Sequence, residues 1–352
     1  MDISHLLRLR LANQQLAYSP SQSVPDIVSW LGAVQSQEFT DAKWSIGQRI
    51  PGLSEAAFNE AFNAGTILRT HVLRPTWHFV SPADIRWMLA LTAPRIKAFM
   101  RTNDRKLGLD EAIFARSNTL IQRALEGSKH LTRPEVAEVL KQNGIPLVSN
   151  ALAHLLARAE IDGIICSGAM RSRQHTYALL EERAPQSRVL TREEALAELT
   201  FRYFSSHGPA TIRDFSWWSG LTLTDVRLGL EAVKTQLASE TIEGNTYWYG
   251  PSSADGGTFR DQAYLLPNFD EYVVAYADRK TLLEPSYEGP LHMQGAILSH
   301  RTIVLNGRIV GTWKVVKAKS TSTFTMNLSR SLSETETGLV EQAWRDYRAF
   351  YH

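Results

Sequence analysis

The pattern of apolar and polar positions changes near residue 262. Before it, capped segments with apolar residues at helical spacing dominate the chain. After it, QAYLLPNFDEYVVAY, HRTIVLNGRIVGTWKVV and STFTMNL alternate or run apolar with β-branched residues, which indicates strands. The pattern predicts an α+β protein in which helical modules precede a compact β module, either closed into a small barrel or backed by helices.

One segment of the helical region has the order typical of a winged helix. Thr132 and Glu135 form a capping box that opens a helix, and Gly144 ends it. SNALAHLLARAE supplies the second helix, and IDGIICSG and RQHTYALL supply two strands. The loop between these strands bears Arg171 and Arg173 and is the predicted wing.

A second segment repeats this order. Thr191 and Glu194 make a capping box for a helix that Gly208 ends, and two shorter helices and a hairpin follow. A degenerate third copy lies near the amino end, where GLSEAAFNEAFNAGTILRTHVLRPTWHFV runs from a helix into strand-like segments. Repetition without a short fixed period predicts duplicated modules rather than a solenoid.

Turn and cap signals mark the later elements. The hairpin in ETIEGNTYWYG is predicted around Gly244-Asn245, and Asn306-Gly307 predicts a second tight hairpin in the β module. Ser333 and Glu336 open a C-terminal packing helix. The expected division is as follows: an N-terminal helical region with the degenerate winged helix at 1–120, winged helices at 121–187 and 188–255, and the small β-barrel-like module with its helix at 256–352.

Composition indicates a globular protein in a reducing compartment. A chain of 352 residues is too long for one core, so several modules are expected. The single cysteine, Cys166, excludes an internal disulfide and a cysteine-rich zinc site. The amino end interleaves arginine with leucine and lacks a signal-peptide core, and no window is apolar enough to span a membrane. We therefore expect a cytoplasmic protein.

The distribution of charge is more informative than the net charge of +2. Three stretches, 61–83, 163–180 and 289–333, contain basic residues and no acidic residue. Each alone is typical of a solvated basic loop, but three together favour contact with phosphate groups. The residues that we expect to bind DNA are Arg74, His78, Arg171, Arg173, Lys314, Lys317 and Lys319.

Aromatic neighbours leave alternatives open at two places. Trp77 and Phe79 flank His78, so a satisfied core position is the alternative to DNA contact for this histidine. Adjacent Trp217 and Trp218 are candidates for base stacking, with burial in a helical core as the alternative.

Gln35 and Gln37 occupy positions where aliphatic residues are expected. The preceding helix starts at Ser23, and Gln35 lies four residues after Leu31, so it continues the buried stripe. A buried amide is either tied into a network or kept available for a ligand. The two amides diverge if the helix continues and align if the backbone becomes extended at Ser36. The alternative is that Gln35 satisfies backbone groups at the helix end while Gln37 is solvated.

Several segments together resemble one family. VSWLGAVQSQEFTDAKWSIGQRI, LRTHVLRPTWHFVSPADIRWML, LLPNFDEYVVAYADR and NGRIVGTWK are similar, in this order, to the AlkZ-like winged-helix DNA glycosylases, bacterial proteins related to YcaQ. Their diagnostic motif is a glutamine, an aliphatic residue and a second glutamine, which Gln35 and Gln37 fit. Ser36 departs from the pattern. The YcaQ branch has an acidic second member, so Gln37 places the chain on the AlkZ side.

The resemblance implies a DNA repair enzyme that excises alkylated purines and unhooks interstrand crosslinks. A purine alkylated at N7 is cationic and leaves without protonation, so the enzyme must mainly position water at C1′. Gln35 and Gln37 are the implied catalytic residues, since a carboxamide oxygen can accept from that water. No cofactor or metal is expected, because the histidines are scattered and no dinucleotide or P-loop pattern occurs.

Asp270 and Glu271, in PNFDEY, are further candidates at the mouth of the β module. A carboxylate near a developing oxocarbenium ion stabilises it, so Asp270 is included among the predicted catalytic residues. The alternative is an ion pair at the strand end with Arg279 or Arg74.

Three functions are compatible with the sequence. The first is a monofunctional glycosylase that acts on double-stranded DNA, and the second is a non-catalytic winged-helix regulator. A regulator usually dimerises through a dedicated helix and reads bases with a basic helix, and the sequence shows neither. We therefore expect a monomer that contacts DNA and no membrane. The third is a family member that kept the scaffold and lost activity through changes such as Ser36.

Overall fold

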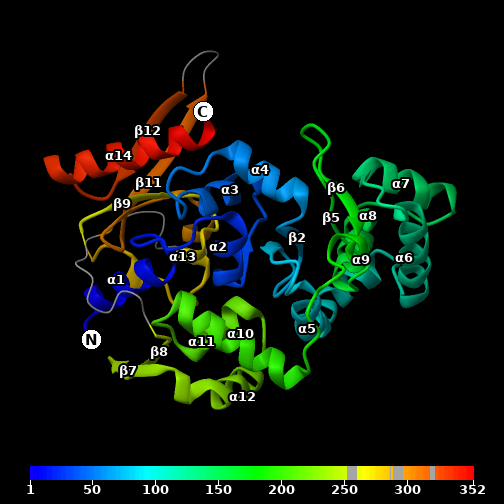
Figure 1. Ribbon diagram of the computed structural model, residues 1–352, viewed down its shortest axis with the longest axis horizontal. Helices are drawn as coiled ribbons and strands as arrows, with labels where there is room; N and C mark the ends of the chain where they lie inside the picture. The colour runs from blue at the N-terminus through cyan, green and yellow to red at the C-terminus, as the bar shows by residue number, and fades with distance from the viewer. Residues whose placement is uncertain (252–259, 286, 288–295, 318–321) are drawn as a thin grey trace. The chain divides into compact units, whose positions relative to one another are not determined.

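The computed structural model describes residues 1–251, 260–285, 287, 296–317 and 322–352 (Figure 1). It has a mixed α/β fold that divides into two compact units. Unit 1 comprises Met1–Phe58, Ala197–Trp218 and Thr222–His352, and unit 2 comprises Asn59–Leu196 and Ser219–Leu221. The expected four-module division remains a prediction, and its last linker, at 252–259, lies outside the described residues.

Unit 1 contains a four-stranded antiparallel sheet in the order β12-β11-β10-β9. Its strands are β9 (Ala263–Leu266), β10 (Thr302–Leu305), β11 (Arg308–Lys317) and β12 (Ser322–Leu328). The predicted turn at Asn306-Gly307 is confirmed, because both residues have the positive φ that a tight hairpin of the primed type requires.

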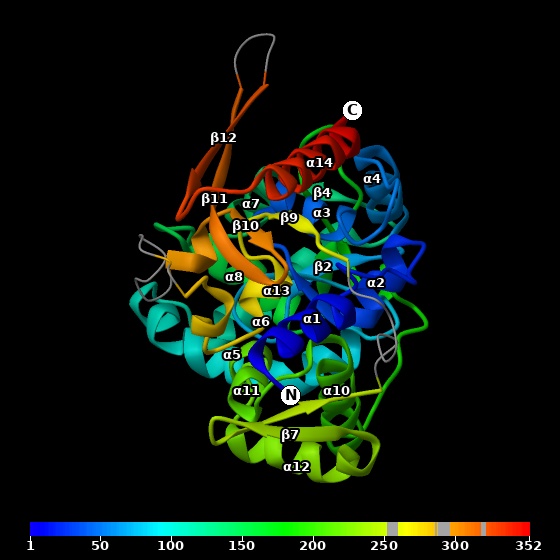
Figure 2. The ribbon, with the colours of Figure 1, turned by 90° about the vertical axis from the view of Figure 1, so that its left-hand side faces the viewer.

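The sheet is backed by a helix and is not closed. Helix α14 (Glu334–Tyr351) lies along the β11–β12 strands in both views (Figures 1 and 2), and the predicted Ser333–Glu336 capping box opens it. Trp313 and Tyr347 pack edge to face at 5.0 Å, and Phe324 stacks on Trp344 at 4.8 Å. Among the described residues β9 and β12 remain edge strands, so the helix-backed alternative holds and a closed barrel is not observed.

The other elements of unit 1 surround the sheet in sequence order. They are α1 (Ile3–Asn13), α2 (Val24–Leu31), β1 (Ala33–Gln35), α3 (Phe39–Gly47), most of α10 (Arg192–His207), α11 (Ile212–Ser219), α12 (Leu223–Val233), η1 (Lys234–Gln236), β7 (Ala238–Ile242), β8 (Asn245–Tyr249), α13 (Glu271–Val274), η2 (Lys280–Leu282) and η4 (Ala296–Ser299). The β7–β8 turn consists of Glu243-Gly244, both with positive φ. The predicted Gly244-Asn245 turn is therefore wrong by one residue, because Asn245 already pairs with Ile242.

Unit 2 carries the first predicted helix and strand repeat. Its elements are most of α4 (Glu55–Ala64), β2 (Leu68–His71), β3 (Trp77–Val80), α5 (Ile85–Lys106), α6 (Glu111–Leu125), β4 (Leu131–Thr132), α7 (Arg133–Gln142), α8 (Ala151–Ile161), β5 (Ile165–Ser167), β6 (Thr176–Leu179) and α9 (Leu180–Arg183). The capping box of Thr132 and Glu135 is confirmed, and Gly144, with φ of 71°, follows α7. Helices α6, α7 and α8 share one apolar core with β5 and β6.

Among the described residues, no helix is both long and apolar enough to cross a membrane.

Candidate functional site

The segment with the two glutamines begins where α2 ends. Ser23 caps α2 through its side chain, as the sequence predicts. The helix stops at Leu31, because Gly32 adopts a φ of 78°, a left-handed conformation that glycine tolerates best. The prediction that Gln35 continues the helical stripe is therefore wrong. Gln35 ends strand β1, and the backbone leaves the helix at Gly32 rather than at Ser36.

The two carboxamide residues have different surroundings. Gln35 is buried, with 6% of its surface exposed, whereas Gln37 is exposed. The backbone N–H of Gln35 donates to Glu271 Oε1 at 2.7 Å, which is short for an N–H···O contact and typical of an ionised acceptor. Gln35 is thus held from its backbone, while Gln37 lies where solvent can reach it.

Asp270 precedes α13 and is fully buried. Its Oδ1 and Oδ2 accept from Nη2 and Nη1 of Arg49, each at 2.9 Å, which is a bidentate ion pair. A hydroxyl from α3 and an amide at its C-terminal end add donors to Oδ2 at 2.7 and 3.1 Å. The alternative of an ion pair is therefore realised, but with Arg49 in place of Arg279 or Arg74. Its charge is neutralised locally, and its catalytic role stays a prediction.

Glu271 accepts hydrogen bonds from three elements of unit 1. Besides Gln35 N–H, the indole N–H of Trp218 donates to Oε2 at 2.9 Å, and Nε2 of His207 lies 3.4 Å from the same oxygen. All three side chains, Glu271, Trp218 and His207, are fully buried. Burial lowers the pKa of His207, while the neighbouring Glu271 opposes this shift. Glu271 was only an accessory candidate in the sequence, and the structure gives it the direct contact with Gln35.

The adjacent tryptophans separate into two environments. Trp218 is fully buried, whereas Trp217 is 41% exposed. The indole N–H of Trp217 donates to the Val274 carbonyl at 2.9 Å, and the Arg279 guanidinium lies 4.9 Å from the ring centroid. The core alternative therefore holds for Trp218, and Trp217 keeps an accessible face.

In unit 2, the loop between β2 and β3 places Arg74 beside His78. His78 is fully buried, with Nδ1 2.9 Å from the Thr76 carbonyl and Nε2 3.3 Å from Nη2 of Arg74. A carbonyl only accepts and a guanidinium only donates, so the imidazole carries its proton on Nδ1. Burial, followed by the charge of Arg74, holds the pKa of His78 well below its usual value. This position favours the core alternative for His78, while Arg74 is half-buried.

A buried acid and histidine pair lies on the opposite face of the β2–β3 hairpin. Nδ1 of His71 contacts Glu160 Oε2, and the indole N–H of Trp77 donates to Oε1 at 3.3 Å. The Arg69 guanidinium lies 4.4 Å from the Trp77 ring centroid. Sequence analysis missed this cluster, because Glu160 follows His71 by 89 residues and sits within an apolar helix.

The predicted wing is the loop between β5 and β6. Arg171 donates to Glu135 Oε1 at 2.7 Å and to the His130 carbonyl at 2.6 Å, so it ties the loop to the start of α7. The backbone and side chain of Thr132, together with Arg171, lower the pKa of Glu135 to about 2. Arg173 is exposed at the tip. Of the two predicted contacts, Arg173 is the better placed for a ligand.

The lysines of the β module are described only in part. Lys314 is exposed on β11. Lys317 closes the same strand, but its side chain lies outside the described residues, as does all of Lys319.

Helix α5 presents a basic face that sequence analysis did not single out. Its acidic residue, Asp104, is buried and accepts from Nδ1 of His154 at 2.6 Å. The exposed basic residues of its C-terminal half are Arg95, Arg101, Arg105 and Lys106. A count of charge along the helix would have found them, since only one acidic residue accompanies them.

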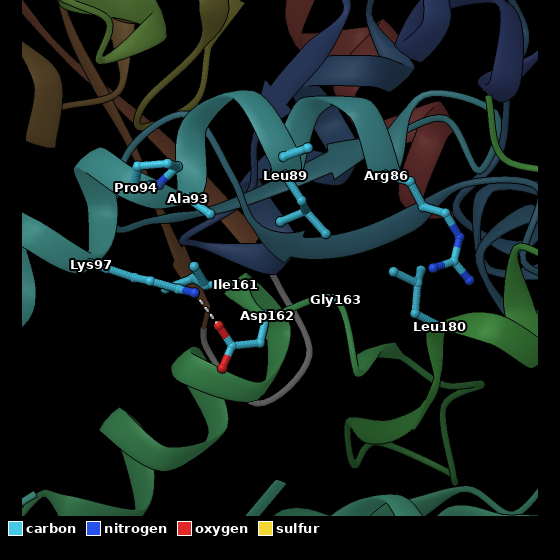
Figure 3. Close-up of a pocket in the computed structure, with 10 residues that line it drawn as sticks. Arg86, Leu89, Ala93, Pro94, Lys97, Ile161, Asp162, Gly163 and Leu180 are labelled. Carbon is cyan, nitrogen blue, oxygen red and sulfur yellow. Dashed lines mark ion pairs between the residues drawn. The ribbon is translucent and has the colours of Figure 1, made fainter. Parts of the chain in front are cut away.

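A pocket of about 550 Å³ lies in unit 2 between α5 and the end of α8 (Figure 3). Leu89, Ala93 and Ile161 line its apolar part, and Lys97 pairs with Asp162 at its edge. None of the predicted site residues lines this pocket, so no catalytic role is assigned to it. Within the described ranges, no three His, Cys, Asp or Glu residues gather in a way that would hold a metal ion.

Comparison with known proteins relates nearly the whole chain to one family. The model of the family described as DNA glycosylase AlkZ-like matches residues 28–350. The chain is 22% identical over 321 residues to the interstrand DNA cross-link repair glycosylase of Streptomyces sahachiroi, and the alignment covers 87% of this chain and 86% of that protein.

The solved structure of the Streptomyces sahachiroi DNA glycosylase AlkZ has a similar fold. Its TM-score is 0.81 at 19% sequence identity, with 99% of this chain and 96% of that chain covered. At this identity the likeness concerns the fold alone.

Proposed function

The chain belongs to the AlkZ-like family of DNA glycosylases, an enzyme family, and we propose from this that it hydrolyses the N-glycosidic bond of N7-alkylated purine nucleotides in duplex DNA. Purines joined in interstrand crosslinks are included in the proposal, because the curated relative carries that activity in its name. The observation that carries the proposal is the matched segment itself. In it Gly32 turns the chain out of a helix, a buried carboxylate holds Gln35, and Gln37 faces solvent.

In the proposed reaction the C1′–N9 bond breaks and its electron pair neutralises the cationic purine. A water molecule adds to C1′ and releases its proton to solvent, so the products are a free base and an abasic site. The carboxamides of Gln35 and Gln37 accept from this water and orient it. Unmodified purines are poor leaving groups, so leaving-group chemistry supplies much of the selectivity.

Asp270 enters this proposal as a supporting residue. Its bidentate pair with Arg49 fixes the turn that precedes Glu271, so both carboxylates keep their places against α3 and β1. A carboxylate already neutralised by a guanidinium contributes less field at the sugar than one that is not.

We also propose that the two helix and hairpin segments act as winged helices that grip the DNA backbone. Arg173 at one loop tip and Lys314 on β11 are exposed cations suited to phosphate oxygens, and the basic face of α5 adds four more. Each phosphate contact releases a bound counterion, so alanine at Arg173 is expected to flatten the salt dependence of DNA binding by about one unit of slope. An unchanged slope would remove Arg173 from the interface.

The direct test incubates the purified chain with duplex DNA that contains one N7-methylguanine. Free base is measured by chromatography and abasic sites by alkaline cleavage. Gln35→Ala and Gln37→Ala are each expected to lower the single-turnover rate about a hundredfold, since both amides position the water. Gln342→Ala, an exposed glutamine on α14, is the matched control and is expected to leave the rate unchanged.

The alternative function is a non-catalytic DNA-binding or regulatory protein. Tight binding of the lesion duplex without base release by the wild-type chain would favour this alternative and overturn the proposed hydrolysis. Release that survives both glutamine substitutions would keep the activity and remove the glutamines from it.

A further inference from the structure

Two adjacent buried carboxylates differ in how their charge is balanced. Asp270 faces a full positive charge, the guanidinium of Arg49, at 2.9 Å from each oxygen. Glu271 faces uncharged donors: the backbone N–H of Gln35 at 2.7 Å and the indole N–H of Trp218 at 2.9 Å. Both Glu271 oxygens act as acceptors in these contacts, which is the arrangement that a carboxylate requires.

The third neighbour of Glu271 does not neutralise it either. Nε2 of His207 lies 3.4 Å from Oε2, and Nδ1 lies 2.8 Å from the hydroxyl of Ser206. A neutral imidazole satisfies both contacts when Nε2 carries the proton and the hydroxyl donates to Nδ1. His207 is fully buried and stacks on Tyr203 at 5.1 Å, which disfavours its charged form.

Two other charged residues buried in unit 1 offset one another. The Arg10 guanidinium lies 3.7 Å from the Tyr276 ring centroid and donates through Nε to the Pro209 carbonyl. Asp214 accepts the backbone N–H of Ala277 at 2.9 Å. Their signs are opposite, so the negative charge of Glu271 remains the uncompensated one in this group.

We propose that Glu271 is a positioning residue of the glycosylase reaction, which fixes the end of β1 through the Gln35 N–H and supplies a fixed negative charge to the site. This inference rests on the proposed function. Breaking the glycosidic bond leaves positive charge on the deoxyribose, and a preorganised anion in a buried setting stabilises that charge without reorganisation. Glu271 is sealed from solvent, so it acts through its field and through Gln35 rather than by touching the sugar.

The first test compares the single-turnover excision of N7-methylguanine by wild-type and Glu271→Gln chains. The glutamine keeps the shape and one acceptor for the Gln35 N–H but removes the charge. We expect the rate to fall about 10²- to 10³-fold with the affinity for DNA unchanged. Asp214→Asn is the matched control, because it removes another buried, hydrogen-bonded charge of unit 1, and its rate is expected to stay within about threefold of wild type.

The second test measures charge recognition at equilibrium, which a purely structural role would not change. Duplexes carry either a cationic pyrrolidine or a neutral tetrahydrofuran in place of the abasic sugar. The wild-type chain is expected to prefer the pyrrolidine at least about tenfold, since it resembles the cationic transition state. Glu271→Gln is expected to lose this preference and keep its affinity for the tetrahydrofuran duplex.

An equal preference in both chains, or an unchanged excision rate, would overturn the inference. A wild-type chain that releases no base overturns the proposed function, and this is seen before any variant is compared. If Glu271→Gln does not fold, Glu271→Asp decides: it keeps the charge but withdraws it from Gln35. The rate is then expected to fall about tenfold with the preference for pyrrolidine retained, and a wild-type rate would refute the positioning role.

Discussion

Replacing Arg49 with methionine tests the buried ion pair that holds the turn before Glu271. The substitution keeps an unbranched side chain and removes all the guanidinium donors. Asp270, fully buried, then loses its two bonds of 2.9 Å, and the Gln14 and Ser45 carbonyls lose donors at 2.9 and 2.6 Å. Breaking one side of a buried pair costs about 3–5 kcal/mol, because the remaining charge stays in a poor solvent.

Hydrogen exchange is the suitable assay, because it reports the opening of unit 1 separately from that of unit 2. The amides of α13 are expected to exchange more than about a hundredfold faster in Arg49→Met, since about 1.4 kcal/mol corresponds to a tenfold change. Arg279→Met is the control, because that half-buried guanidinium stacks on Trp217 and is worth about 0.5–1 kcal/mol.

A loss below about 1 kcal/mol in Arg49→Met would refute the reasoning, since it would mean that water or another cation reaches Asp270. Adding Asp270→Leu to the methionine variant is expected to recover part of the loss, because two apolar side chains leave no charge to solvate. A double variant that is no more stable than the single one would contradict the account.

Three further outcomes follow from local geometry. Gly307→Ala is expected to destabilise the protein by about 1–3 kcal/mol more than Gly52→Ala in denaturant titration, because both glycines have positive φ but only at Gly307 would a Cβ lie 2.8 Å from another side chain; equal losses would count against this. The Arg330 ion pair lowers the pKa of Glu336 to about 2, so its stabilisation is present above about pH 4.5 and lost as the pH falls towards 2. Carboxyl NMR should show Glu336 titrating near 4.5 in Arg330→Gln, and an unshifted midpoint would refute the pairing. Burial raises the pKa of the Cys166 thiol to about 12, so iodoacetamide is expected to label it only after unfolding, and fast labelling of the native chain would contradict its burial.

Local signals in the sequence were sufficient wherever the structure is decided by neighbours in the chain. The Thr132 and Ser333 capping boxes and the Asn306-Gly307 turn are confirmed, because each depends on residues no more than three positions apart. The turn at Glu243-Gly244 was misplaced by one residue, because asparagine also tolerates positive φ and the sequence does not fix the register of the strands.

The site residues depended on contacts that no local pattern encodes. Arg49 reaches Asp270 across 221 positions and His71 reaches Glu160 across 89, so neither pair follows from spacing. The break after Leu31 was available in the sequence as Gly32, but an apolar stripe that runs on to Val34 is equally typical of a continuing helix. The resemblance to a family supplied what periodicity did not, namely which glutamines to examine.

The discontinuity of unit 1 affects how the chain is made. Its first stretch, Met1–Phe58, leaves the ribosome long before Thr222–His352, whereas unit 2 is almost one continuous stretch, Asn59–Leu196. Unit 2 can therefore collapse during translation, while the early helices keep their apolar faces uncovered until α14 has been synthesised. Such a nascent chain is a natural client for chaperones, and slow codons late in the message would lengthen its exposure to aggregation.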